Sequence, residues 1–388
     1  MFSNRTDWKL THNRLTEALE EVRASGVRVL DLTLSNPTRA GLVYEESRIL
    51  HALASPQVMD YDPQPKGLPS ARAAVAAYYR GAHGIRDFDP ERLILTTSTS
   101  EGYSFVFRLL CNPGDELLVP KPSYPLFEFL ADLQDVKLVP YPLIYDHGWQ
   151  MDFPSLARAV SPRTRGVVVV HPNNPTGSYV HAQEQEALNS FCREHKIAII
   201  ADEVFLDYAL NGVPERSFAA NQDALTFTLS GVSKISALPQ MKVAWVATSG
   251  PPEEVEAAMA HLEVISDTYL SMNAPIQWAV PVLLEQRDPV QKQLLERVNK
   301  NLAELDRQLA EQKTCQRLGV EGGWYAVLRV PVTQTDEELV VELLRRNSVL
   351  VHPGHFYDFP GDGYLVLSLI AAQDEFAEGI KRVLKFIA

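Results

Sequence analysis

The sequence predicts an α/β fold: a large, mostly parallel sheet flanked by helices, plus a smaller α+β domain from the C-terminal region and the N-terminal segment. Three observations predict it. Short β-branched runs alternate with helix-like segments between about residues 90 and 250, which is typical of parallel sheets covered by helices. The runs are continuously apolar, as in strands buried on both faces. After about residue 312 the pattern changes to mixed strands and helices.

In chain order, a helix at 12–25 and a strand at 27–34 come first, and we expect this segment to pack with the C-terminal region. The strands of the large sheet are then predicted at 92–97, 116–120, 136–141, 166–171, 197–203, 226–230 and 243–249. The intervening helices include 100–111, 123–134 and 181–196.

Residues 251 to about 312 resemble long helices. The remaining elements are expected at 324–330 (strand), 335–347 (helix), 349–352 and 364–370 (strands) and 373–387 (helix). We therefore predict a large domain at 45–285 and a small domain made of 1–44 and 286–388.

Composition excludes several classes of partner. The 388 residues include 36 Lys and Arg against 49 Asp and Glu, a net charge of −13, which argues against nucleic-acid and anionic-membrane partners. The three cysteines are far apart, so neither a disulfide framework nor a thiolate metal site is indicated. We expect a cytoplasmic protein, since the N-terminus lacks an apolar signal region and the apolar runs are too short to span a bilayer.

Polar residues follow several of the predicted strands, at the edge where open α/β sheets bind ligands. Residues 96–102 (TTSTSEG) offer hydroxyls and backbone N–H groups at a helix N-terminus, which suits an anion. Ser98 and Glu101 also have the spacing of a capping box, and the two interpretations are compatible. Residues 171–177 (HPNNPTG) form a rigid loop after an apolar strand, with an ordinary turn as the alternative.

Two further strand ends carry charged side chains. Asp202 ends the apolar run IAIIA, where an acid is costly without a partner; it is either a helix N-cap or a carboxylate that holds a cation or a protonated ring nitrogen. The stretch 230–245 (SGVSKISALPQMKVAW) contains Lys234 and Lys242 but no acid. A lysine in apolar surroundings loses its proton more easily and can then form a Schiff base, although a surface role is the alternative for either lysine alone.

Taken together, an anion cradle, a rigid amide loop, a buried acid and an imine-forming lysine are what a phosphorylated pyridine aldehyde requires. At this point the chain resembles the fold-type I pyridoxal-phosphate enzymes, specifically the class I/II aminotransferase family. The resemblance runs from about Leu30 to the C-terminus. It rests on NNPTG, ADEVF, SxxSK and the HPG at 352–354, which occur in the family's order and spacing.

The resemblance implies roles for individual residues. Lys234 corresponds to the catalytic lysine that forms the Schiff base with pyridoxal 5'-phosphate. Asp202 corresponds to the acid that keeps the pyridine nitrogen protonated. Asn174 corresponds to the asparagine that hydrogen-bonds the ring oxygen and lies next to the substrate.

The same resemblance implies five further cofactor contacts. Tyr124 corresponds to the aromatic residue that stacks on the ring, and Thr99 and Ser100 fall in the phosphate cradle. Lys242 occupies the place of a phosphate-binding arginine. Tyr61 looks like the tyrosine that reaches the phosphate from the neighbouring subunit, so a homodimer is implied.

The activity implied is transfer of an amino group between an amino acid and a 2-oxo acid. A pyridoxal-phosphate-dependent β-lyase, decarboxylase or synthase on the same scaffold is the alternative. A dinucleotide-binding oxidoreductase would suit the sheet, but the sequence contains no GxGxxG.

Two positions depart from the family pattern. Phe205 stands where members usually have a tyrosine whose hydroxyl bonds the ring oxygen, and Tyr208 is a possible replacement. Val366 stands where an arginine usually grips the substrate α-carboxylate. We expect Arg39 to supply the missing cation, with weaker alternatives at Lys66, His352 and His355.

Overall fold

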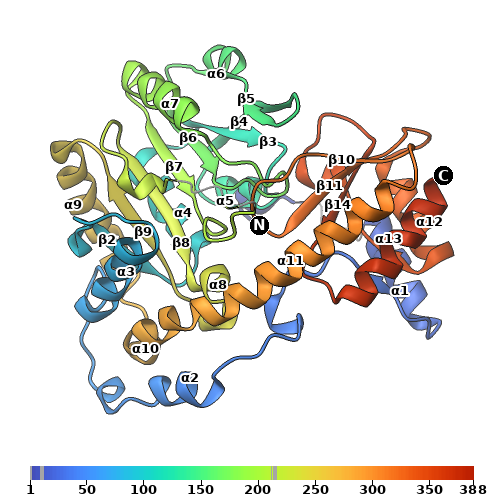
Figure 1. Ribbon diagram of the computed structural model, residues 1–388. Coiled ribbons are helices and arrows are strands. Elements are labelled where there is room, and N and C mark those ends of the chain that lie inside the picture. Colours follow the sequence, from blue (N-terminus) through green and yellow to red (C-terminus); the bar gives the residue numbers. More distant parts are fainter. Residues whose placement is uncertain (1, 9–12, 211, 213–215) are drawn as a thin grey trace.

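The computed structural model describes residues 2–8, 13–210, 212 and 216–388. Its larger sheet has eight strands in the order β2-β9-β8-β7-β6-β3-β4-β5 (Figure 1). Strands β3, β4, β6, β7 and β8 are mutually parallel, whereas β9 and β5 run antiparallel to their neighbours. The bounds are β2 (Leu93–Thr96), β3 (Glu116–Lys121), β4 (Lys137–Tyr145), β5 (Trp149–Met151), β6 (Thr164–Val170), β7 (Ala198–Asp202), β8 (Thr226–Gly231) and β9 (Ala244–Ser249).

Helices cover both faces of this sheet. In β6, Val168 packs in one apolar cluster with α4 and α9, while its neighbour Val167 packs in another with α7 on the opposite face. Because successive strand residues point to opposite faces, both sets must be apolar, as the continuous runs predicted. The helices are α3 (Pro69–Ala82), α4 (Thr99–Leu110), α5 (Phe127–Asp132), α6 (Phe153–Ala159), α7 (Ala182–His195), α8 (Val232–Ile235), α9 (Pro252–Thr268) and α10 (Ala274–Glu285).

A second, antiparallel sheet has the order β10-β11-β14-β13. The N-terminal segment lies beside it: β1 pairs in parallel with β12, and α1 packs against α12. Helix α11 runs from beside α10 toward this sheet (Figure 1), where it packs on α13. The bounds are α1 (Arg14–Ala24), β1 (Leu30–Asp31), α11 (Arg287–Leu309), β10 (Gln316–Arg317), β11 (Tyr325–Arg329), α12 (Asp336–Asn347), β12 (Val349–Leu350), β13 (His352–Pro353), β14 (Tyr364–Ser368) and α13 (Gln373–Ile387).

Several predicted boundaries were wrong. The strand at 27–34 is reduced to the two residues of β1, because only these pair with β12. The helix at 123–134 begins only at Phe127, because Pro125 disfavours the helical conformation of the residue before it. Helices α2 (Glu46–Leu53) and α3 and strand β5 were not predicted. Residue 12, the predicted start of the first helix, lies outside the described residues.

The predicted long helical region at 251–312 consists of α9, α10 and α11. The strand at 349–352 is divided into β12 and β13, which join different sheets. Within the described ranges, no helix has both the length and the apolar character needed to cross a membrane.

Candidate active site

A cavity of about 460 Å³ lies where the carboxyl ends of β6, β7 and β8 and the start of α4 face one end of the small sheet. Its floor combines residues from the large sheet and its loops with the start of α4. The opposite wall comes from the small sheet and its loops. The polar residues that line it include Thr99, Ser100, Asn174, Asp202, Lys234, Tyr325, His352 and Tyr357.

Lys234 lies in α8, immediately after β8, and its side chain opens on the cavity. The ammonium nitrogen Nζ is 5.0 Å from the ring centroid of Trp324 and 5.4 Å from that of Phe205. Loss of water around Nζ lowers the lysine pKa from 10.5 to about 8, although the Asp202 charge opposes the shift. About a tenth of Lys234 is therefore an uncharged, nucleophilic amine at pH 7, far more than for an ordinary lysine.

Asp202 is the last residue of β7 and is buried. Its carboxylate accepts hydrogen bonds from the Tyr103 hydroxyl (2.9 Å) and the Val204 backbone N–H (3.1 Å). Burial nevertheless raises its pKa to about 6, so these donors do not fully compensate for lost water. The adjacent Glu203 is engaged elsewhere, accepting from Ser217 and the Phe218 backbone.

Asn174 is presented to the cavity by the loop after β6. Its neighbour Asn173 ties this loop down by donating to the Pro122 carbonyl (3.1 Å) and to Thr176 Oγ1 (2.9 Å). Gly177 has φ +69°, and a Cβ there would lie 2.4 Å from Val320 Cγ2, so only glycine fits. Asn174 Oδ1, in contrast, is buried and has no hydrogen-bond partner among the described residues, which leaves it available to a ligand.

The start of α4 has a side-chain cap close to the predicted capping box, although Glu101 bonds the residue before the N-cap. Ser98 is the N-cap and accepts from the Glu101 N–H, while the Glu101 carboxylate accepts from the Thr97 N–H (2.6 Å). Thr99 and Ser100, in the first turn, line the cavity. The cap fixes the helix start, whose dipole and N–H groups favour a negative charge.

Of the other predicted cofactor residues, one lines the cavity and two do not. Tyr124 lines the cavity, and burial raises its pKa to about 12, with a contribution from the Asp202 charge. Lys242 is exposed and does not line the cavity, and Tyr61 is 77% exposed. Neither reaches the cavity within this single chain.

Of the residues predicted to bind the substrate carboxylate, some line the cavity and others do not. His352 lines the cavity, with Nδ1 3.0 Å from the Tyr357 hydroxyl, and burial lowers its pKa. Arg39 and His355 are exposed and do not line it. Lys66 is paired with Glu91 at 2.5 Å.

Val366 is 1% exposed and is directly opposite His352 in the antiparallel pair β13-β14. Residues opposite each other in such a pair point to the same face. The family's arginine position is therefore apolar here, and an imidazole stands beside it.

The hydroxyl missing at Phe205 is not replaced by Tyr208. The Tyr208 hydroxyl donates to the Lys234 carbonyl oxygen at 2.6 Å, so it holds the lysine backbone. Sequence reasoning missed Tyr103, the partner of Asp202, and Trp324, which packs beside Nζ. Both are apolar-type residues within helical or strand-like runs, and nothing in their local sequence distinguishes them from core residues.

Comparison with known proteins agrees with this geometry. The family model for aminotransferase class I and II matches residues 29–375. The alanine aminotransferase of Mycobacterium tuberculosis is 28% identical over 94% of this chain and 87% of its own length. The glutamate-pyruvate aminotransferase AlaA of Haemophilus influenzae is 27% identical over 96% of this chain and 93% of its own length.

Solved structures show the same fold. An aminotransferase from Escherichia coli superimposes with a TM-score of 0.87 at 25% identity, covering 100% of this chain and 98% of its own. The alanine aminotransferase of Pyrococcus furiosus gives a TM-score of 0.91 at 22% identity, covering 100% and 99%. The chain thus belongs to the class I and II aminotransferase family, and it is an aminotransferase of fold type I.

Proposed function

We propose that Lys234 is the catalytic residue of a pyridoxal-phosphate site in this cavity, which transfers an amino group between an amino acid and a 2-oxo acid. The family's members use this cofactor. One observation carries the assignment: Lys234, with a pKa near 8, opens on the same cavity as the buried carboxylate of Asp202. A lysine in a purely structural role would not need a desolvated amine beside a buried acid.

The residues of the cavity suit the cofactor. Asp202 would hold the protonated ring nitrogen, and this positive charge would compensate the burial that raises the Asp202 pKa. Asn174, which makes no hydrogen bond through Oδ1 among the described residues, would donate from its amide nitrogen to the ring oxygen. Thr99 and Ser100 would hold the phosphate at the start of α4, and Tyr124 would cover one face of the ring.

When bound, the cofactor supplies an aldehyde that binds amines and a protonated ring that accepts electrons. Lys234 Nζ, uncharged in part at neutral pH, would hold that aldehyde between turnovers. As a free amine, the same nitrogen would act as the base that takes a proton from the substrate α-carbon. The rings of Phe205 and Trp324 limit access of water to Nζ.

For the substrate, the named relatives suggest alanine and glutamate as the first amino donors to test, with pyruvate as an acceptor. A separate proposal concerns the side chain that binds the substrate carboxylate. Arg39 lies four residues after Ser35, which lines the cavity, and no ion pair engages it among the described residues. We propose that Arg39 moves onto the substrate carboxylate and that His352 donates a second, neutral hydrogen bond from the wall.

We also propose a homodimer in which Tyr61 reaches the phosphate of the neighbouring site. Tyr61 lies in a segment with other exposed apolar side chains, including Val43 (75%), Leu50 (63%) and Met59 (85%). Exposed apolar clusters of this kind mark interfaces. Mixing Lys234→Ala with Tyr61→Ala protein should then restore activity, because a mixed dimer contains one unaltered site.

A cytoplasmic setting is part of the same proposal. All three cysteines, Cys111, Cys192 and Cys315, are free thiols. A reducing compartment keeps such thiols reduced.

The function is tested by adding amino acids to the cofactor-loaded protein and recording its visible band. Alanine or glutamate should bleach the band and release the matching 2-oxo acid, and the Lys234→Ala variant should lose this reaction. Release of ammonia together with pyruvate, without bleaching, would instead identify an eliminating enzyme.

A further inference from the structure

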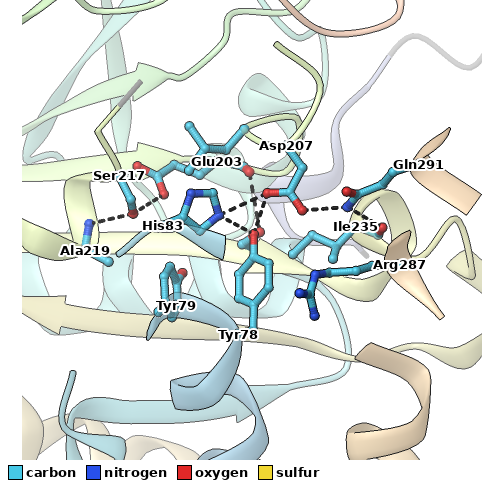
Figure 2. Close-up of polar contacts among 12 residues, drawn as sticks. Tyr78, Tyr79, His83, Glu203, Asp207, Ser217, Ala219, Ile235, Arg287 and Gln291 are labelled. Carbon is cyan, nitrogen blue, oxygen red and sulfur yellow. Dashed lines mark hydrogen bonds and ion pairs between the residues drawn. The ribbon is translucent and has the colours of Figure 1, made fainter. Parts of the chain in front are cut away.

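A buried polar cluster lies beside the turn that carries Lys234, and the mechanism above makes no use of it (Figure 2). We call Tyr78, His83, Asp207 and Gln291 the Asp207 cluster. The Asp207 side chain is 6% exposed, and its Oδ1 accepts from the Tyr78 hydroxyl at 2.7 Å. His83 Nε2 is 3.0 Å from the same oxygen and 2.8 Å from the Tyr78 hydroxyl.

The cluster reaches the lysine turn through Gln291 of α11. Gln291 Nε2 donates to Asp207 Oδ2 at 2.6 Å and to the Ile235 carbonyl at 2.8 Å, as Figure 2 shows. An amide nitrogen carries two hydrogens, so it can make both bonds at once. Because Ile235 directly follows Lys234, a side chain more than 50 residues away fixes the peptide group one residue beyond the lysine.

Two other carbonyl groups of the turn are also held by side chains. The Tyr208 hydroxyl donates to the Lys234 carbonyl at 2.6 Å, and the Tyr44 hydroxyl donates to the Ala237 carbonyl at 2.8 Å. Helix α8 is only four residues long, so the carbonyls at its end have few helical partners, although the Lys234 carbonyl also accepts from the Ala237 N–H at 3.1 Å. Side chains from three other parts of the chain therefore add hydrogen bonds to the end of this short helix.

The charge of Asp207 determines how Gln291 is oriented. Burial disfavours the charged form of Asp207, but the hydrogen bond and charge of His83, with the bonds from Tyr78 and Gln291, outweigh burial and hold its pKa below the usual value. An ionised carboxylate accepts but does not donate. The Gln291 amide must therefore turn its nitrogen toward Asp207, and the same nitrogen then faces the Ile235 carbonyl.

We propose that Asp207, Gln291 and Tyr208 are positioning residues for Lys234: they fix the backbone of its turn, so that Nζ stays in the cavity beside Asp202. The importance of this position for amino transfer rests on the proposed function. The backbone contacts themselves do not depend on it.

The chain offers matched controls for both kinds of contact. Gln308, also on α11, donates from Nε2 to the Glu304 carboxylate (2.8 Å) and to the Ala377 carbonyl (2.9 Å). Gln308→Met thus removes the same two kinds of hydrogen bond as Gln291→Met, but at a place away from the lysine. For Tyr208→Phe the control is Tyr141→Phe, since the buried Tyr141 hydroxyl donates to the Val168 carbonyl at 2.8 Å.

The first measurement is hydrogen exchange of backbone amides 234–241 in cofactor-free protein. Gln291→Met and Tyr208→Phe should each speed exchange there about tenfold, because a lost hydrogen bond of about 1.4 kcal/mol corresponds to one decade. Gln308→Met and Tyr141→Phe should lower the melting temperature comparably and leave this segment unchanged. Equal exchange in Gln291→Met and Gln308→Met would overturn the proposal.

The second measurement separates kcat from KM in the loaded enzyme. Gln291→Met should lower kcat about tenfold with KM nearly unchanged, because the reacting amine is displaced while substrate contacts remain. Asp207→Asn should act likewise, and adding it to Gln291→Met should lower kcat little further. Fully additive losses would contradict a shared route through Gln291. Because exchange is measured without cofactor, absence of amino transfer in the unaltered chain would count against the proposed function only.

Discussion

The two sides of the cavity differ in charge. The floor, from β7, β8 and the start of α4, holds a buried carboxylate, Asp202, and an amine, Lys234. The wall, from the small sheet and its loops, presents His352, Tyr325 and Tyr357 and no arginine. The difference shows that the buried acid and the reactive amine lie on the floor, whereas the wall offers an imidazole and two phenol groups.

The largest effect is expected at the floor, from Asp202→Asn. Removal of a buried charge partner costs about 3–5 kcal/mol, so cofactor binding should weaken at least a hundredfold. The cofactor-free protein should respond in the opposite sense. Burial raises the Asp202 pKa from 3.8 to about 6, so stability falls as the pH rises through this range and the full loss remains above it.

Both sides of this prediction can be measured by titrating the cofactor into each protein and by unfolding the cofactor-free forms with urea at pH 7. Asp202→Asn should be at least as stable as the unaltered chain when no cofactor is present. If Asp202→Asn bound the cofactor with unchanged affinity, Asp202 would not be the residue that holds it.

At pH 8, Lys234 should react about two orders of magnitude faster than an ordinary lysine, because far more of it is uncharged. Its pKa is lowered from 10.5 to about 8, so at pH 8 roughly half is neutral, against under about 1% for an ordinary lysine. The rate of cyanate labelling of this peptide in cofactor-free protein should therefore level off just above pH 8. A rate still rising steeply at pH 10 would show that the cavity does not desolvate the amine.

Two substitutions compare a charged and a neutral side chain proposed to bind the substrate carboxylate. Arg39→Ala should raise KM for alanine or glutamate about 10- to 100-fold if the guanidinium closes onto the carboxylate, because charged hydrogen bonds contribute about 1.5–3 kcal/mol. His352→Ala should raise KM only about two- to tenfold, as expected for a neutral hydrogen bond. An unchanged KM in Arg39→Ala removes Arg39 from the account, and the wall alone would then select the substrate.

A smaller effect is expected from Asn174→Ala. Without cofactor, the unpaired Oδ1 contributes no hydrogen bond, so the free energy of unfolding should change by less than about 1 kcal/mol. With cofactor, loss of one neutral hydrogen bond should raise the dissociation constant about two- to tenfold. A large loss of stability in the cofactor-free protein would mean that Asn174 serves the loop itself.

Much of the floor could be predicted because each of its residues lies at a strand end with its own local signal. Asp202 ends an apolar run, Lys234 lies in a segment without acids, and Asn174 lies in a proline-rich loop. The same reasoning predicted where the strands of the large sheet lie along the chain, since strands buried on both faces must be continuously apolar.

The wall and the Asp207 cluster could not be predicted because they depend on tertiary packing. His83, Asp207 and Gln291 are far apart in sequence, and none lies in a motif. His352 was one of four candidate anchors, and only the pairing of β13 with β14 brings it next to Val366. Likewise, β1 is short because its length depends on β12, a partner more than 300 residues away.

The central claim is tested most directly by reducing the cofactor-loaded protein with borohydride and mapping the modified peptide. We expect a single labelled lysine, Lys234, with Lys242 unmodified. A label on any other lysine, or no label on a coloured protein, would contradict it.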